Sequence, residues 1–172
     1  KECYRIIDKK AARVDVLVNE MFLLLKLDNP EYKLEPEQTD LCELVRSACA
    51  EYYEELEDKG IEMHIEIPET PITAAVDRKE FTRVIENLLS NIGKYNRTGQ
   101  GAWITVRESG ERAEIIVQDD GEAVAEDIRP ILFDPFVRGD KARISKGGTG
   151  LGLAIARKIV GKLSGTIEYA YE

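Results

Sequence analysis

A glycine-rich stretch near the C-terminus has the composition of an anion-binding turn. It reads Gly147-Gly148-Thr149-Gly150-Leu151-Gly152-Leu153 and runs into an apolar helical pattern. Glycine lets a backbone approach a ligand closely, and the free N–H groups at a helix start attract anions. No Gly-Lys-Ser/Thr follows, so the stretch is not a P-loop, and no strand pattern precedes it, as a dinucleotide fingerprint requires. The alternative interpretation is a helix start with flexible hinges.

Two asparagines and a lysine share one face of a helix that we expect over 78–95. Asn87, Asn91 and Lys94 are spaced by four and three residues, which places them in one stripe. Amide oxygens suit a hard cation such as Mg²⁺, and an ammonium group suits a phosphate. The alternative is a solvated helix face. The core contacts of this helix are expected on its other side, from Val84, Ile85, Leu88 and Leu89.

Two loops carry further polar groups. Asp119-Asp120-Gly121 directly follows a strand expected over 114–118, so a carboxylate fixed there can accept a hydrogen bond from an exocyclic amine. The alternative is a plain turn. The loop over 133–140 mixes aromatic side chains with Arg138 and has no clear periodicity; one interpretation is that its aromatic groups anchor a long loop.

The order of the elements around these residues predicts an α+β fold: a sandwich with a mixed sheet and helices on one face, preceded by a long N-terminal helix. Alternating apolar residues predict strands, and a period near 3.6 predicts helices. The expected helices lie over 1–28, 40–58, 78–95, 126–132 and 150–163, and the expected strands over 32–36, 61–67, 72–76, 103–108, 114–118 and 166–171.

The first helix carries an apolar seam with heptad spacing, which is typical of a helix that pairs with another helix. Either this seam packs on its own domain, or it belongs to a helical hairpin or dimer. The seam consists of Ile7, Ala11, Val14, Val18, Met21 and Leu25.

Composition excludes several other classes. The 172 residues include 24 Lys or Arg and 33 Asp or Glu, a net charge of −9, so we expect no nucleic-acid partner. His64 is the one histidine, which argues against multi-histidine metal sites, and its strand position predicts a solvated side chain. No apolar run reaches the roughly 18 residues that a membrane span needs. The start has no signal-peptide pattern and no Met, so we expect part of a longer protein.

Four motifs, in this order and spacing, resemble those of sensor histidine kinases. They are an N box at Asn87–Asn91 with Lys94-Tyr95, a first glycine box at Asp119–Ala123, an F box at Leu132–Asp140 and a second glycine box at Gly148–Ala156.

The resemblance covers about residues 33–172 and implies two parts. Residues 1–29 would belong to the second helix of a dimerisation and phosphoacceptor hairpin, and 30–172 would form an ATP-binding catalytic domain with the Bergerat-type fold of gyrase and heat-shock chaperones. Ala123 departs from the family glycine; if its backbone must be left-handed, the cost is about 1–2 kcal/mol.

The resemblance also implies the residues of a site for Mg-ATP or ADP. Asn91 would bind Mg²⁺, Asp119 would recognise the adenine amine, and residues 122–147 would form a mobile lid. Asn87, Lys94 and Arg138 would serve the transfer step. The nucleotide would contact Asn91, Lys94, Tyr95, Asp119, Gly121, Arg138, Gly148, Thr149, Gly150, Leu151 and Gly152.

The implied activity is transfer of the γ-phosphoryl group of ATP to a histidine outside this chain, on the hairpin of a homodimer, and then to an aspartate of a response regulator. The implied location is the cytoplasmic region of a membrane-anchored bacterial sensor. Two alternatives remain: an ATPase of the same superfamily that drives conformational change, for which a glutamate base would be expected at Asn87, and an interaction module without nucleotide.

Overall fold

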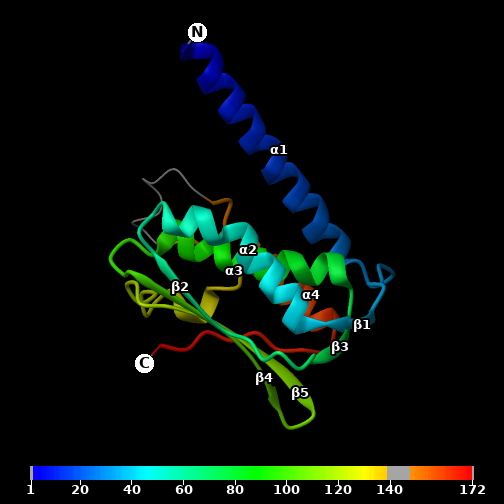
Figure 1. Cartoon of the computed structure of the whole chain (residues 1–172). Coiled ribbons are helices and arrows are strands. Elements are labelled where there is room, and N and C mark those ends of the chain that lie inside the picture. The colour runs from blue at the N-terminus through cyan, green and yellow to red at the C-terminus, as the bar shows by residue number, and fades with distance from the viewer. Residues whose placement is uncertain (1, 139–147, 172) are drawn as a thin grey trace.

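The structure, a computed structural model, describes residues 2–138 and 148–171 (Figure 1). A long first helix precedes a domain of alternating helices and strands. The helices are α1 (Glu2–Asp28), α2 (Leu41–Glu57), α3 (Arg78–Tyr95) and α4 (Gly152–Lys162), with a 3₁₀ helix at Arg129–Ile131; the strands are β1 (Glu37–Asp40), β2 (Glu62–Glu66), β3 (Thr73–Val76), β4 (Gly101–Ser109) and β5 (Arg112–Asp119).

The central sheet is mixed, as the sequence predicted. β2 runs parallel to β4, and β4 runs antiparallel to β5, with Ile104 opposite both Ile65 and Val117. β1 and β3 form a separate antiparallel pair. In Figure 1, α2 and α3 cover one face of the three-stranded sheet. The core between them is built on Val45, Leu56, Ile85, Leu89, Ile104 and Val106.

The opposite face of the sheet carries the one histidine. His64 pairs in register with Trp103, and the neighbours of Trp103 on β4, Ala102 and Ile104, are buried against the helices. Side chains alternate along a strand, so His64 and Trp103 lie on the other face. Their rings stack with centroids 5.2 Å apart. His64 is therefore half-buried beneath an indole rather than simply solvated.

Side-chain caps begin the two central helices where the sequence predicted. Asp77 accepts a hydrogen bond from the backbone N–H of Glu80 at 3.1 Å. Asp40 accepts from the N–H groups of Cys42 and Glu43. These bonds satisfy N–H groups that have no partner within the helix. α3 consequently begins at Arg78, and this start determines which side of the helix its polar residues occupy.

Two predicted strands are absent from the described residues. Residues 32–36 are irregular: the backbone carbonyl of Tyr32 accepts a hydrogen bond from Lys162 Nζ at 2.8 Å, so it is satisfied by a side chain of α4. Residues 166–171 have no strand partner. There, Ile167 packs against the α4 cluster and the Tyr169 hydroxyl accepts from the Val124 N–H. In both segments the alternation reflects side-chain packing rather than a hydrogen-bonded ladder.

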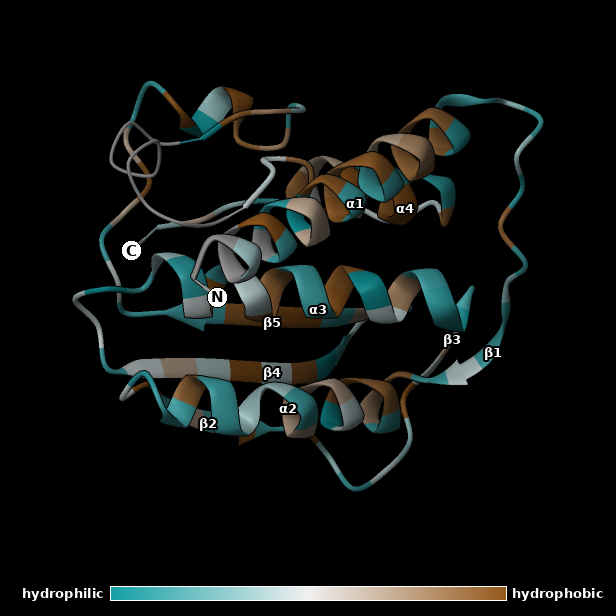
Figure 2. Cartoon of the chain, turned by 90° about the horizontal axis from the view of Figure 1, so that it is seen from above, coloured by the Kyte–Doolittle hydropathy of each residue, from teal (hydrophilic) through white to brown (hydrophobic). Residues whose placement is uncertain are grey.

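α1 lies alongside α4, and the apolar residues of both helices are visible in Figure 2. The contact uses Leu23, Leu24 and Leu27, which pack with Leu151 and Ile155 in a second core cluster. The predicted heptad seam lies elsewhere on α1 and is exposed. Ile7, Val14, Val18, Met21 and Leu25 have exposed fractions of 59%, 57%, 41%, 41% and 63%.

The exposure of the seam favours the interpretation that it pairs with another helix. None of the helices within 2–138 and 148–171 has the length and apolarity required to cross a membrane.

Candidate nucleotide-binding site

α3 brings the predicted N box into contact with the glycine-rich turn. The side-chain Nδ2 of Asn87 donates a hydrogen bond to the carbonyl oxygen of Gly152 at 3.1 Å, across 65 residues of sequence. A Cβ atom on Gly152 would lie 3.1 Å from Oδ1 of Asn87. The first turn of α4 therefore sits directly on the polar face of α3.

The glycine-rich turn needs two of its glycines for their backbone conformation. Gly148 and Gly150 have φ values of +73° and +76°, which side chains disfavour. A Cβ on Gly148 would lie 2.7 Å from the Tyr95 hydroxyl, and one on Gly150 would lie 3.0 Å from the backbone of Phe136. Three segments thus converge on this turn: the end of α3, the F box and the start of α4.

Thr149, between those glycines, is held by two hydrogen bonds. Its hydroxyl oxygen accepts from the N–H of Leu151 at 3.2 Å, and the hydroxyl donates to the carboxylate of Glu20 on α1. The turn is therefore tied to the N-terminal helix. Glu20 was not among the predicted site residues, because no local pattern links two positions 129 residues apart.

The first glycine box meets the C-terminal end of α3. Asn96 caps this end and accepts a hydrogen bond from the Gly99 N–H at 2.8 Å. A Cβ on Gly121 would lie 3.0 Å from Oδ1 of Asn96. Asn96 is thus the residue through which Gly121 contacts the end of α3, and no local sequence pattern identifies it.

The adjacent carboxylates of Asp119 and Asp120 have different partners. Asp120 accepts from the N–H groups of Gly101 at 2.9 Å and Gln100 at 3.1 Å. These backbone hydrogen bonds, that of Gly101 first, lower the pKa of Asp120. Asp119 accepts from the N–H of Gly121 at 2.9 Å and is exposed. It shares the strand face of Val117, which packs against the core, so Asp119 lies on the helix side of the sheet.

The predicted cation and phosphate ligands are open to a ligand. The side chains of Asn91 and Lys94 have no hydrogen-bond or ion-pair partner within residues 2–138 and 148–171. Asn91 is half-buried and Lys94 exposed, and Tyr95 is 41% exposed. Asn91 lies one turn beyond Asn87 on α3. An amide oxygen and an ammonium group are therefore available beside the glycine-rich turn.

The predicted lid is only partly described. Arg138 is half-buried at the end of one described range, and residues 139–147, including Lys141, Arg143 and Lys146, lie outside the described residues. Ala123 is described, and it is not among the non-glycine residues with positive φ. The alanine therefore imposes no left-handed strain on the first glycine box.

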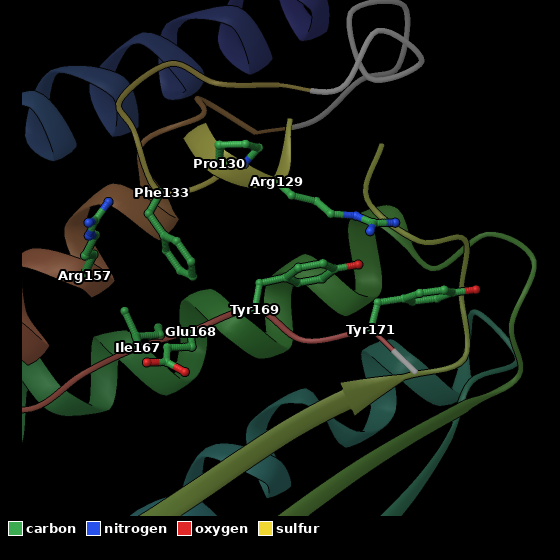
Figure 3. A pocket seen from close by; sticks show the side chains of 8 residues that line it. All are labelled: Arg129, Pro130, Phe133, Arg157, Ile167, Glu168, Tyr169 and Tyr171. Atoms are coloured by element: carbon green, nitrogen blue, oxygen red, sulfur yellow. The ribbon is translucent and has the colours of Figure 1, made fainter. Parts of the chain in front are cut away.

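A separate cavity lies beside the C-terminal segment (Figure 3). It has a volume of about 440 Å³ and none of its lining residues is a predicted site residue. The lining comes from the 3₁₀ helix and the loop after it, from α4 and from the C-terminal segment: Arg129, Pro130, Phe133, Arg157, Ile167, Glu168, Tyr169 and Tyr171.

The donor set suits magnesium held jointly with phosphates. Within the described residues no group of three His, Cys, Asp or Glu side chains could hold a metal by itself. Mg²⁺ commonly binds through one or two protein oxygens together with substrate phosphates. The amide oxygen of Asn91, beside a turn of left-handed glycines, is compatible with that arrangement.

Sequence comparisons identify the same region. The family described as histidine kinase-, DNA gyrase B-, and HSP90-like ATPase matches residues 76–172. The sensor protein GtcS of Aneurinibacillus migulanus is 32% identical over 89% of this chain and 41% of its own length. The sensor histidine kinase WalK of Bacillus subtilis is 32% identical over 94% of this chain and 27% of its own length. The chain therefore spans less than half of these relatives.

Structural comparisons agree on the fold. The Acinetobacter baumannii histidine kinase AdeS matches with a TM-score of 0.80 over 97% of this chain and 76% of that one, at 23% identity. Full-length ShkA, solved in complex with AMPPNP, matches with a TM-score of 0.75 over 90% of this chain and 32% of that one, at 25% identity. The histidine kinase ThkA, solved with the response regulator TrrA, matches with a TM-score of 0.73 over 96% of this chain and 45% of that one, at 24% identity.

Proposed function

This chain belongs to the histidine kinase-, DNA gyrase B- and HSP90-like ATPase family as the ATP-binding catalytic region of a sensor histidine kinase, and we propose that its nucleotide site binds ATP together with Mg²⁺ along the polar face of α3. One observation carries the proposal. Three contacts, at Asn87, Tyr95 and Asn96, gather both glycine boxes around Asn91 and Lys94 of α3, whose side chains have no partner among the described residues.

Each part of the site has a proposed role that follows from its chemistry. The exposed carboxylate of Asp119 accepts a hydrogen bond from the adenine amine, and Gly121 leaves room for the ring. The N–H groups of residues 148–152 bind phosphate oxygens, as free N–H groups at a helix start do. Arg138 and Tyr95 border the nucleotide from the lid and from α3.

The charged part of the ligand is proposed to lie between α3 and the turn. Asn91 would hold Mg²⁺, which would neutralise phosphate charge during transfer. Lys94 adds a positive charge on the same helix face. Asn87 orients the first turn of α4 through its bond to Gly152. In phosphoryl transfer the protein mainly positions the groups and neutralises charge, and this set of side chains supplies both effects.

For the whole protein, we propose transfer of the γ-phosphoryl group to a histidine on the hairpin of its own dimer. The exposed seam of α1, Ile7 to Leu25, would pack in that hairpin. A response regulator would then receive the phosphoryl group on an aspartate; ThkA was solved with such a partner. We further propose that this region lies in the cytoplasm, as part of a bacterial sensor anchored in a membrane.

The superfamily alternative, an ATPase with a glutamate base, finds less support. The residue at the required position is Asn87, and its amide is bonded to Gly152. Its neighbour Glu86 lies near enough to Tyr52 of α2 that its negative charge, after burial, is the next cause of the raised pKa of Tyr52. A carboxylate on that side of α3 cannot activate a water beside the glycine-rich turn.

A calorimetric titration with AMPPNP, with and without Mg²⁺, tests the proposal. We expect binding that strengthens with Mg²⁺, and we expect Asn91→Ala to remove most of the effect of the metal. Lys94→Ala should lower the affinity for ATP more than the affinity for ADP, because the triphosphate carries more charge. Lys79→Ala, at the exposed start of α3, is the matched control and should bind normally. A lack of AMPPNP binding by the unmodified chain would refute the proposal.

A further inference from the structure

The contact between Glu20 and Thr149 joins the N-terminal helix to the phosphate-binding turn. The Thr149 hydroxyl donates to the Glu20 carboxylate and its oxygen accepts from the Leu151 N–H. One hydroxyl group therefore connects α1, the middle of the turn and the first residues of α4. A hydrogen bond that involves a charged group is stronger than one between neutral groups.

The rest of the α1–α4 interface holds Glu20 in register with the turn. Asp28 forms an ion pair with Lys158. Lys162 donates to the carbonyl oxygens of Asn29 at 3.3 Å and Tyr32 at 2.8 Å. Between these polar contacts and Glu20, the buried leucines of α1 pack on α4. A rotation or a slide of α1 would therefore move the carboxylate away from Thr149.

The turn has a particular need for such a contact. Left-handed glycines flank Thr149 on both sides, and glycine has more conformational freedom to lose than any other residue. A turn that is ordered before the ligand arrives binds more tightly, because less entropy is lost on binding. Leu151, the N-cap residue of α4, makes no side-chain cap. Thr149 thus supplies a side-chain acceptor for the N–H of Leu151 at this helix start, in addition to the bond between Asn87 and Gly152.

We propose that Glu20 is a positioning residue that pre-orders the phosphate-binding turn through the hydroxyl of Thr149. The inference rests on the proposed nucleotide site. The contact between Glu20 and Thr149 would make docking of α1 on α4 favour nucleotide binding. Nucleotide binding would favour docking in turn, because coupling between two sites is reciprocal. A signal that displaces the α1 helix would thereby lower the affinity for nucleotide, with no contact between Glu20 and the ligand itself.

The test compares AMPPNP affinity among five variants and the unmodified chain. Glu20→Ala removes the acceptor and is expected to weaken binding about tenfold, the low end of the effect of a hydrogen bond that involves a charged group. Glu20→Gln keeps an acceptor oxygen, so its affinity should stay within twofold. Combining Glu20→Ala with Thr149→Val should weaken binding no more than Thr149→Val alone. Asp15→Asn, exposed on α1, is the matched control for loss of charge.

A second readout separates positioning from a general loss of stability. Without nucleotide, the amide hydrogen of Leu151 should exchange faster in Glu20→Ala than in Glu20→Gln, while both proteins unfold at the same temperature. Unchanged affinity in Glu20→Ala would overturn the inference, and so would equal weakening in Glu20→Gln. If the unmodified chain bound no AMPPNP, the proposed function itself would fail, which is a different result from normal binding by every variant.

Discussion

Asp120, the residue directly after β5, accepts a hydrogen bond from the backbone N–H of Gly101 at the start of β4. Its other oxygen accepts from Gln100, and Asn96 donates to the same carboxylate at 3.3 Å. Asp120 therefore joins two strands to the end of α3. This arrangement also fixes the backbone of Asp119, the adjacent residue proposed to recognise adenine.

Asp120 should make stability depend on pH at the acidic end. The hydrogen bonds lower its pKa in the folded protein, so the folded state favours the charged form. The stabilisation is present above the pKa of the unfolded carboxyl, about 3.9, and is lost as pH falls through the lower, folded pKa. We expect Asp120→Ala to unfold at a lower denaturant concentration than the unmodified chain at pH 7. The difference between the two denaturant midpoints should shrink below pH 4. A constant difference at every pH would contradict this account.

The carboxylate of Asp119, next to Asp120, should affect ATP binding rather than folding. Asp119→Asn replaces the proposed acceptor by a group that can present an N–H to the adenine amine. We expect the free energy of ATP binding to weaken by about 1.5–3 kcal/mol, the range for a hydrogen bond that involves a charged group. Calorimetry measures the change, with Asp127→Asn, at an exposed carboxylate eight residues later, as the control. An unchanged affinity in Asp119→Asn would remove this residue from the site.

Gly150→Ala should destabilise the chain because the backbone is left-handed and the space is occupied. The conformation alone costs about 1–2 kcal/mol for a residue with a side chain, and the new Cβ would lie 3.0 Å from the Phe136 backbone. Gly161, in the α4 helix that follows the turn, has no atom within 4 Å of such a Cβ. Gly161→Ala should therefore stabilise by up to about 1 kcal/mol. Denaturant unfolding measures both; equal effects would contradict the assignment of strain to the turn.

Local sequence signals predicted much of this fold, and contacts between distant segments account for the rest. The cap at Asp77 and the period of α3 were sufficient to place Asn87 and Asn91 on the polar face. The segment 32–36 was wrongly predicted as a strand, because its alternation comes from packing on α4, a helix more than a hundred residues later. Alternation alone does not distinguish a ladder from such packing.

The candidate site likewise contains residues that local sequence patterns predicted and residues that only tertiary contacts identify. Glycine spacing predicted the turn at 148–152, since left-handed positions require glycine. Asn96, Asp120 and Glu20 support the site through long-range hydrogen bonds, and their residue types are common in exposed helices and loops. Only the tertiary structure distinguishes them from solvated side chains.

The last prediction concerns where phosphate label will appear. The proposed transfer needs an imidazole in line with the γ-phosphate, and the one histidine of this chain, His64, stacks on Trp103 on the sheet face opposite the helices. We expect no label on this chain after incubation with labelled ATP, and label on a separately added hairpin that bears an acceptor histidine. Leu25→Lys, at an exposed seam position, should reduce that labelling without lowering nucleotide affinity, because it disturbs helix pairing only. Label on this chain that His64→Ala abolishes would refute the prediction.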